Sequence, residues 1–241
     1  MTPGATMKQP VSLRVWGEFA CFTRPEMKVE RVSYRVPTPS AGRGILEAVF
    51  WEPEMYYVID SITVLKPGKW FSFRRNEVGK VISIAEAKSA MAGKKPMEPI
   101  RAGGGADDAA QRNMLALVDV EYVFTAEIRL TEKGKGEGEK EVKYVEQFKS
   151  RAAKGKCAHR PALGVREFAA DFEYSDGPPP ITNGLTEDLG IMLYDVFDPT
   201  KRLTEKNVRP QPVFFNAAIT NGHMECHPDK VTILRPGTGR V

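Results

Sequence analysis

Hydrophobic and polar positions recur with definite periods along the first 175 residues, and these periods predict alternating strands and helices. Val11–Phe22 mixes alternating apolar residues with aromatics, which is typical of a strand. Ser40 is a good N-cap, and apolar residues from Ile45 to Phe50 repeat at helical spacing until Pro53 ends the pattern. Tyr56–Leu65 is β-branched and alternating, so a second strand follows this helix.

The middle of the chain contains strand patterns separated by a long irregular stretch. Trp70–Arg74 is predicted to pair back with the preceding strand as a hairpin across Lys66–Lys69, which contains a Pro-Gly turn signal. Residues 81–112 have weak periodicity and contain AGGGADD, so they are predicted to form a long, mobile insertion. Val118–Leu130 then has the clearest strand pattern in the chain.

Glycine and alternating charge dominate the run TEKGKGEGEK, which starts at Thr131 and is predicted to be a disordered hairpin tip. Glu141–Lys154 has helical periodicity, and four of its apolar residues are predicted to face the core: Val142, Val145, Phe148 and Ala152. A glycine-bearing loop, Gly155–Gly164, leads into a last strand at Val165–Tyr174.

The predicted order is therefore β-α-β-β-α-β with insertions, which is the ferredoxin-like arrangement and also the plan of RNA-recognition modules. DGPPP at Asp176–Pro180 breaks the chain, and short strand-rich segments follow it. We predict an α+β protein with two domains. Residues 1–175 form a ferredoxin-like, RRM-like N-terminal domain with insertions, and residues 176–241 form a small C-terminal antiparallel β-sheet domain.

Composition narrows the class of protein. With 241 residues and 41% hydrophobic content, the chain can bury a full core, which excludes a disordered or fibrous protein. It lacks the unbroken apolar run of a membrane span, and MTPGATMKQP at its start lacks the apolar core of a signal peptide. Three widely spaced cysteines, Cys21, Cys157 and Cys226, argue against a disulfide framework. We therefore expect a cytoplasmic protein without membrane contact.

The formal charge of +4 is unevenly distributed along the chain. Eight acidic and seven basic residues lie from Asp176 onward, so the first 175 residues carry +5. A basic excess confined to one part of the chain fits a polyanionic partner such as RNA, and an excess this small also fits an ordinary solvated surface.

Several basic residues lie where nucleic-acid backbones are commonly bound. Arg43 falls in the first turn of the first predicted helix, where free N–H groups favour a phosphate, although the flanking glycines also allow close packing. Arg74 and Arg75 end a predicted strand, and either RNA binding or simple solvation fits them. The loop Gly155–Gly164 combines flexible glycines with three side chains that suit a phosphate backbone: Lys156, His159 and Arg160.

Aromatic and metal-ligating residues give weaker indications. Three aromatics on the first strand offer base-stacking surfaces, although strand aromatics more often face the core: Trp16, Phe19 and Phe22. His223, Cys226 and His227 lie close in sequence, yet a structural zinc needs four ligands and no partner cluster exists. We therefore predict no metal site and no cofactor.

The most specific signal is the block Arg14–Pro53, whose centre reads YRVPTPSAGRGILEAVFW. Together with RRNEV at Arg74 and LGVREFAADF at Leu163, it resembles the CRISPR-associated Cas family five of the Dvulg, or type I-C, subtype. The resemblance implies an RNA-binding protein that cuts precursor CRISPR RNA within its repeat, without metal. It also implies that the protein keeps the crRNA as a subunit of the surveillance complex, beside its backbone and large subunits.

The implied reaction is attack by a ribose 2′-OH on the adjacent phosphate, which needs in-line positioning, charge stabilisation and proton transfer. Cutting members of the family carry a Tyr near the end of the first helix and a Lys-His pair early in the second. These positions correspond to Phe50, Lys143 and Tyr144, so two of three depart from the pattern. His159, the one histidine of the first domain, or Tyr144 is predicted to compensate for these departures by reaching the scissile phosphate in a different geometry.

RNA-binding positions are predicted at Arg24, Arg43, Arg74, Arg75, Lys156 and Arg160. Two alternatives stay open. A non-catalytic RNA-binding scaffold subunit of the same complex fits the departures at Phe50 and Tyr144, because a tyrosine, with an ordinary pKa of about 10, is a poorer base at neutral pH than a histidine. An RNA-recognition module outside CRISPR systems fits the fold but not the specificity of Arg14–Pro53.

Overall fold

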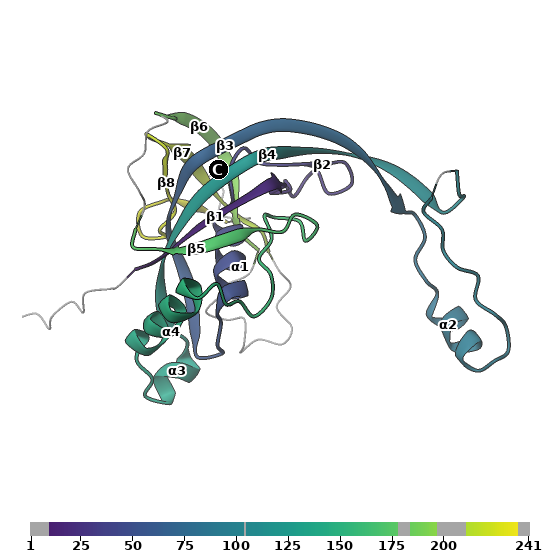
Figure 1. Ribbon diagram of the computed structural model, residues 1–241, viewed down its shortest axis with the longest axis horizontal. Coiled ribbons are helices and arrows are strands. Elements are labelled where there is room, and N and C mark those ends of the chain that lie inside the picture. The colour runs from purple at the N-terminus through teal and green to yellow at the C-terminus, as the bar shows by residue number, and fades with distance from the viewer. Residues whose placement is uncertain (1–9, 104, 178–183, 197–210, 236–241) are drawn as a thin grey trace, which may run out of the picture.

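A main antiparallel sheet forms the body of the molecule (Figure 1). The computed structural model describes residues 10–103, 105–177, 184–196 and 211–235. The strands of this sheet run in the order β5-β1-β4-β3-β8, with β2 beside β4. Their bounds are β1 Val11–Ala20, β2 Arg31–Val32, β3 Met55–Val78, β4 Ala109–Leu130, β5 Asp171–Ser175 and β8 His223–Glu225.

Two helices pack against one face of this sheet: α1, Pro39–Val49, and α4, Glu141–Ala153 (Figure 1). These helices and the four strands that they cover follow one another along the chain as β1-α1-β3-β4-α4-β5, and the strands lie side by side in the order β5-β1-β4-β3. This is the ferredoxin-like arrangement, so the predicted α+β class is confirmed. Between sheet and helices lies a continuous hydrophobic core with Leu13, Leu46, Ile62, Phe124 and Phe148 among its members.

Both core helices form close to where the sequence predicts them. Helix α1 is capped by Thr38, whose Oγ1 accepts a hydrogen bond from the N–H of Ala41 at 3.1 Å, rather than by Ser40. In α4 the predicted inward position of Val142 is wrong, because its side chain is 55% exposed. The buried stripe begins instead at Tyr144 and continues through Val145, Phe148 and Ala152.

Strands β3 and β4 pair over almost their whole lengths, from Met55 opposite Leu130 to Val78 opposite Ala109. The predicted hairpin across Lys66–Lys69 is therefore wrong. The chain passes straight through this segment by way of an irregularity in register between Val64 and Lys66, and Gly68 takes the left-handed φ of +74° there. The Pro67-Gly68 pair, which favours a turn locally, thus lies within a continuous strand just after this irregularity.

Beyond the body, β3 and β4 continue as a two-stranded arm (Figure 1). The arm tip, residues 79–108, corresponds to most of the predicted mobile insertion and contains a helix, α2, Ile84–Met91. Helix α2 buries none of its residues. Several apolar side chains on and beside it are exposed: Val78, Val81, Ile82, Ile84, Met91 and Met97. The arm tip therefore offers an unusually apolar surface for a segment without core contacts.

The charged run after Thr131 is ordered, which corrects the predicted disordered tip. Helix α3, Glu132–Gly136, is capped by Thr131, whose Oγ1 accepts from the N–H of Gly134 and donates to the carbonyl of Pro53. A Cβ on Gly134 would lie 2.4 Å from the carbonyl oxygen of Glu54, so only glycine allows this close approach. Helix α3 is thereby fixed to the chain that leads into β3.

A separate three-stranded sheet contains β6, Glu187–Asp195, β7, Val213–Ile219, and β9, Ile233–Leu234. It agrees with the antiparallel β-sheet expected near the C-terminus, while β8 joins the main sheet. The boundary at residue 176 stays a prediction, and residues 178–180 of that break lie outside the described residues. Every helix in the described ranges is too short or too polar to span a bilayer.

A buried ion pair ties α1 to this second sheet. The Arg43 guanidinium donates to both carboxylate oxygens of Asp195 at 2.9 Å and to Glu47 at 2.9 Å. Arg43 is only 7% exposed, so this contact lies inside the protein. Although burial alone would lower the pKa of Arg43, the two carboxylates raise it, and the guanidinium stays charged.

Replacing Arg43 with glutamine should lower the free energy of unfolding by about 3–5 kcal/mol, because Asp195 would lose the charge that compensates its burial. Denaturant unfolding of the purified variant measures this. Arg160→Gln is the control, since it breaks an exposed pair with Asp171 worth about 0–1 kcal/mol. Equal stabilities for the two variants would refute a structural role for Arg43.

Candidate RNA-cleavage site

The C-terminal end of α1 is the meeting point of the predicted catalytic residues. Phe50 follows α1 directly, and its ring centroid lies 6.5 Å from that of Tyr144 in the first turn of α4. The Arg151 guanidinium, two turns further along α4, lies 5.8 Å from the centroid of the same Phe50 ring. Phe50 thus lies close to both Tyr144 and Arg151, two residues of α4 that are seven positions apart in the sequence.

Three backbone or side-chain donors satisfy the last carbonyls of α1, which ends without a glycine. The carbonyl of Ala48 accepts from the N–H groups of Ala158 at 2.8 Å and His159 at 3.2 Å. The carbonyl of Val49 accepts from Nε of Arg151 at 3.2 Å. These bonds attach the loop after α4 to the end of α1, and so they bring the backbone of His159 to the site.

Lys143 lies at the exposed rim of this cluster. Its ammonium contacts both carboxylate oxygens of Glu139, at 2.7 and 2.8 Å, and lies 5.2 Å from the centroid of the Tyr144 ring. The hydrogen bond to Glu139 is the main reason why the pKa of Lys143 is raised. Lys143 is therefore a protonated group that can give up a proton, but its charge is already balanced by a carboxylate.

Tyr144 is buried, with 2% of its surface exposed. Burial raises the pKa of its hydroxyl, and the nearby Glu139 carboxylate raises it further. The hydroxyl consequently stays protonated at neutral pH and can donate a hydrogen bond, whereas it is a poor acceptor of a proton. A histidine at this position would behave differently, since its ordinary pKa is about 6.5.

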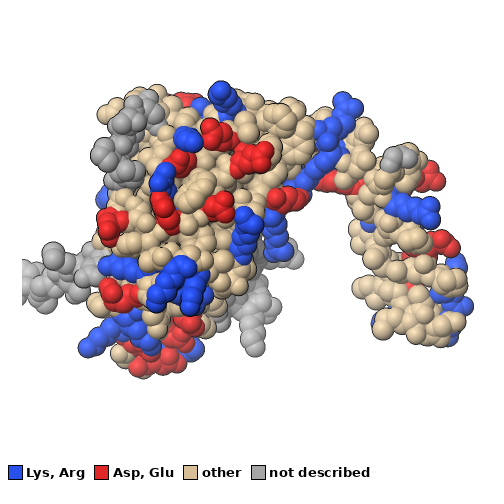
Figure 2. Space-filling view, viewed as in Figure 1, with Lys and Arg blue, Asp and Glu red and all other residues tan. Residues whose placement is uncertain are grey.

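The predicted RNA-binding residues fall into separate regions. Lys156 and Arg160 are exposed in the loop beside the site, and Arg160 pairs with Asp171 at 3.2 Å. Figure 2 shows Lys and Arg side chains gathered around α4, next to acidic side chains around α3. Arg43 lies elsewhere, buried against Asp195, and this placement argues against the predicted phosphate seat in the first turn of α1.

A second group of predicted RNA-binding residues lies near the base of the arm. Arg74 is exposed on β3, while its neighbour Arg75 pairs with Glu77 and, at 2.7 Å, with Glu167. Arg24 lies with its guanidinium 4.9 Å from the ring centroid of Tyr34. Of the two adjacent arginines, Arg75 is held in the protein by carboxylates and Arg74 is open to a ligand.

The three aromatics of β1 do not form one stacking platform. Phe22 is buried against Tyr122, with ring centroids 5.9 Å apart, and Phe19 packs between Phe71 and Phe168. Trp16 lies on the other face of the sheet beside Arg14, whose guanidinium is 5.6 Å from its ring centroid.

That outer face carries a basic group whose charge is compensated. Arg14 forms ion pairs with Glu121 and Glu173, the latter at 2.7 Å. The positive charge beside Trp16 is therefore balanced by two carboxylates.

Sequence reasoning missed Arg151 as a neighbour of the site. Arg151 follows Tyr144 by seven positions, so helical periodicity predicts that both residues lie on one face of α4. What no pattern reveals is that this face meets Phe50, because the contact joins residues far apart in the sequence.

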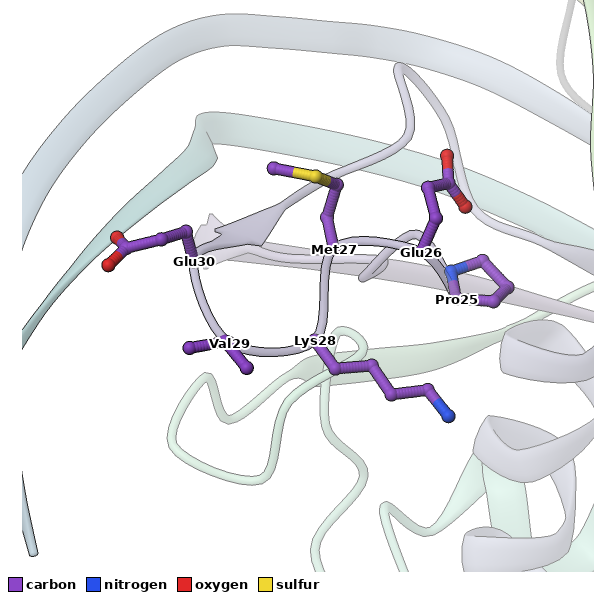
Figure 3. Close-up of a pocket in the computed structure, with 6 residues that line it drawn as sticks. All are labelled: Pro25, Glu26, Met27, Lys28, Val29 and Glu30. Carbon is purple, nitrogen blue, oxygen red and sulfur yellow. The ribbon is translucent and has the colours of Figure 1, made fainter. Parts of the chain in front are cut away.

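A hollow of about 350 Å³ lies at the turn formed by residues 25–30 (Figure 3). Its side chains point away from one another, so they offer no set of converging polar groups. His227 is buried beside Arg129 and Glu127, and Cys226 is buried as well. In the described ranges no three His, Cys, Asp or Glu residues are grouped so as to hold a metal ion.

Comparisons with known proteins cover nearly the whole chain. Residues 11–227 match the family of CRISPR-associated proteins described as Cas_Cas5d. A protein of Mannheimia succiniciproducens is 42% identical over 228 residues, covering 92% of this chain and 96% of its own. One of Thermus thermophilus is 43% identical over 233 residues, covering 91% and 92%. Both carry the name CRISPR pre-crRNA endoribonuclease Cas5d.

Solved structures support the fold. The crystal structure of a CRISPR-associated protein matches with a TM-score of 0.61 and 20% identity, covering 92% of this chain and 94% of the other. At this level of identity the match concerns the arrangement of elements alone.

Proposed function

We propose that this chain, which belongs to the Cas5d family of CRISPR-associated proteins, cuts precursor CRISPR RNA within its repeat and then retains the processed RNA. The observation that carries the proposal is the cluster at the end of α1. Phe50, Tyr144 and Lys143 lie together there, and the backbone of His159 joins them through the carbonyl of Ala48. The names of the two relatives supply the substrate class, precursor CRISPR RNA.

The proposed reaction is an intramolecular transesterification. The ribose 2′-oxygen attacks the adjacent phosphorus, the bond from phosphorus to the 5′-oxygen breaks, and the products are a 2′,3′-cyclic phosphate and a free 5′-OH. The 2′-OH must lose a proton and the leaving 5′-oxygen must gain one. Residues of the chain can serve both transfers, so we propose a metal-independent reaction.

His159 accepts the proton from the 2′-OH in this proposal, because Tyr144 keeps its own proton at neutral pH. Lys143, protonated and at the rim of the site, supplies the proton to the 5′-oxygen. Tyr144 donates a hydrogen bond, and Phe50 provides an apolar ring for packing against the substrate. Lys156 and Arg160 lie in the same loop as His159 and hold the RNA backbone.

Purified protein should cut its repeat RNA in the presence of EDTA and leave a cyclic phosphate. Lys143→Ala should slow single-turnover cleavage about 10²-fold, because the leaving oxygen loses its proton donor. Lys149→Ala is the matched control, since Lys149 lies on the same helix and pairs with Glu146. Product ends are identified by mass spectrometry, and uncut RNA under these conditions would refute the nuclease.

A second function remains open because of two residues. Phe50 lacks a hydroxyl and Tyr144 is a poor base, and both occupy positions where cutting relatives are expected to carry catalytic groups. These departures favour a non-catalytic scaffold that binds crRNA in the same complex. Tight binding of repeat RNA without cleavage would identify this function, and cleavage in EDTA would exclude it.

His159→Ala should lower the cleavage rate by about 10² or more while repeat-RNA affinity changes little, because a base contributes to the transition state rather than to binding. Lys156→Ala should do the reverse and mainly weaken binding. Single-turnover rates and filter-binding affinities separate the two effects. An unchanged rate in His159→Ala would remove His159 from the mechanism and leave the nuclease proposal intact.

We further propose that the arm tip holds this chain in the surveillance complex, beside its backbone and large subunits. Helix α2 buries no residue, and its exposed aliphatic side chains are suited to an apolar groove on another protein. The arm tip contains no aromatic residue for stacking on bases.

We also propose that the protein is located in the cytoplasm, which agrees with free thiols at all three cysteines.

The double variant Ile84→Glu, Met91→Glu should fold and cut RNA normally but fail to assemble with the other subunits, because two charges would face the apolar groove. Size-exclusion chromatography of the reconstituted complex measures this. Ile191→Glu is the control, since Ile191 is an isolated exposed residue of β6. Normal assembly of the double variant would refute the role of the arm tip.

A further inference from the structure

The reaction proposed above has an unmet electrostatic requirement. Attack by the 2′-oxygen produces a phosphorane with more negative charge on its non-bridging oxygens than the starting phosphodiester has. An active site accelerates such a reaction mainly by placing fixed donors and positive charge at those oxygens. Lys143 meets this requirement poorly, because Glu139 already binds its ammonium through both carboxylate oxygens.

Arg151 is a second cation at the same site, and it differs from Lys143 in its partners. Its Nε donates to the carbonyl of Val49 at 3.2 Å, and its guanidinium lies 5.8 Å from the centroid of the Phe50 ring. No carboxylate forms an ion pair with it among the residues that the structure describes, in contrast to Arg43 and Arg75. It therefore brings an uncompensated positive charge to the cluster.

We propose that Arg151 binds the non-bridging oxygens of the scissile phosphate and stabilises the phosphorane, an inference that rests on the proposed RNA cleavage. The bond from Nε to Val49 orients the guanidinium and leaves the terminal Nη groups for the phosphate. A planar guanidinium presents these donors as a fork that matches two phosphate oxygens. Contact with Phe50 restricts the side chain further, so little entropy is lost when RNA binds.

With Arg151 assigned, every proton, bond and developing charge in the proposed cleavage reaction has a group that accounts for it. The proton of the 2′-OH passes to His159, the new bond joins the 2′-oxygen to phosphorus, and the bond to the 5′-oxygen breaks as Lys143 gives that oxygen a proton. Arg151 keeps all its protons and exchanges none. Its contribution is electrostatic, and Phe50 serves to hold it in place where a hydroxyl is missing.

A purely structural role is the competing explanation, because Arg151 also caps the end of α1. Arg151→Ala would then reduce thermal stability and RNA binding together. A catalytic role predicts a different pattern: a slower chemical step in a folded protein that still binds RNA. The two explanations therefore differ in three measurable quantities.

The test compares wild type and Arg151→Ala in single-turnover cleavage at saturating protein concentration. We expect the rate to fall by about 10²–10³, the usual effect of removing one donor to a developing oxyanion. Affinity for repeat RNA with 2′-deoxyribose at the cleavage site should change only a few-fold, and thermal stability should change little. Added guanidinium ion should restore part of the rate in Arg151→Ala, because it can occupy the vacated space beside Phe50.

Two further variants serve as controls for this experiment. Arg151→Lys keeps the charge without the fork and should be intermediate in rate, so it remains informative where the alanine variant is unstable. Lys154→Ala removes an exposed cation one turn along α4 and should cut at the wild-type rate. Wild-type cleavage rates in Arg151→Ala, or a rate loss matched by lost stability and not rescued by guanidinium, would overturn the proposal. A wild-type protein that fails to cut would instead overturn the nuclease itself.

Discussion

The antiparallel pairing of β3 with β4 is the constraint on which the rest of the structure depends. These strands are neighbours in the main sheet, with β1 beside β4 and β8 beside β3. Their outer ends leave the core and become the arm. Because the same ladder serves both parts, its register near Lys66 sets the direction of the arm as well as the position of core residues such as Ile62 and Phe124.

The sequence predicts elements well where a single period dominates and poorly where tertiary contacts decide. Both core helices and the parts of β3 and β4 that lie in the body of the protein follow from periodicity. The Pro-Gly pair at Pro67 favours a turn locally, yet pairing with Val120 keeps the strand continuous. Helix α3 forms because Thr131 and Gly134 contact the chain before β3, which no composition rule reveals. The phase of α4 was misjudged at Val142 because Tyr144 is amphipathic and can be buried.

The candidate site shows the same limit. Phe50, Lys143 and Tyr144 were identified through the family resemblance, and the helix ends do bring them together. Their chemistry depends on neighbours that spacing does not indicate. Glu139 balances Lys143, and burial keeps Tyr144 protonated. Likewise, Arg43 resembles a phosphate ligand in the sequence but compensates Asp195 in the fold.

Compensation of charge is the principle that separates structural from functional cations here. Arginines that each contact two carboxylates, such as Arg14, Arg43 and Arg75, stabilise or orient elements of the fold, and their charge is largely compensated. Many basic residues in the described ranges have such partners, so the formal charge of +4 does not indicate where on the protein a polyanion would be attracted. Arg151 has no close carboxylate among the described residues, and it brings that property into the cluster at Phe50. Under the proposed function, the position of uncompensated charge, rather than the net charge, would direct the phosphate backbone to the end of α1.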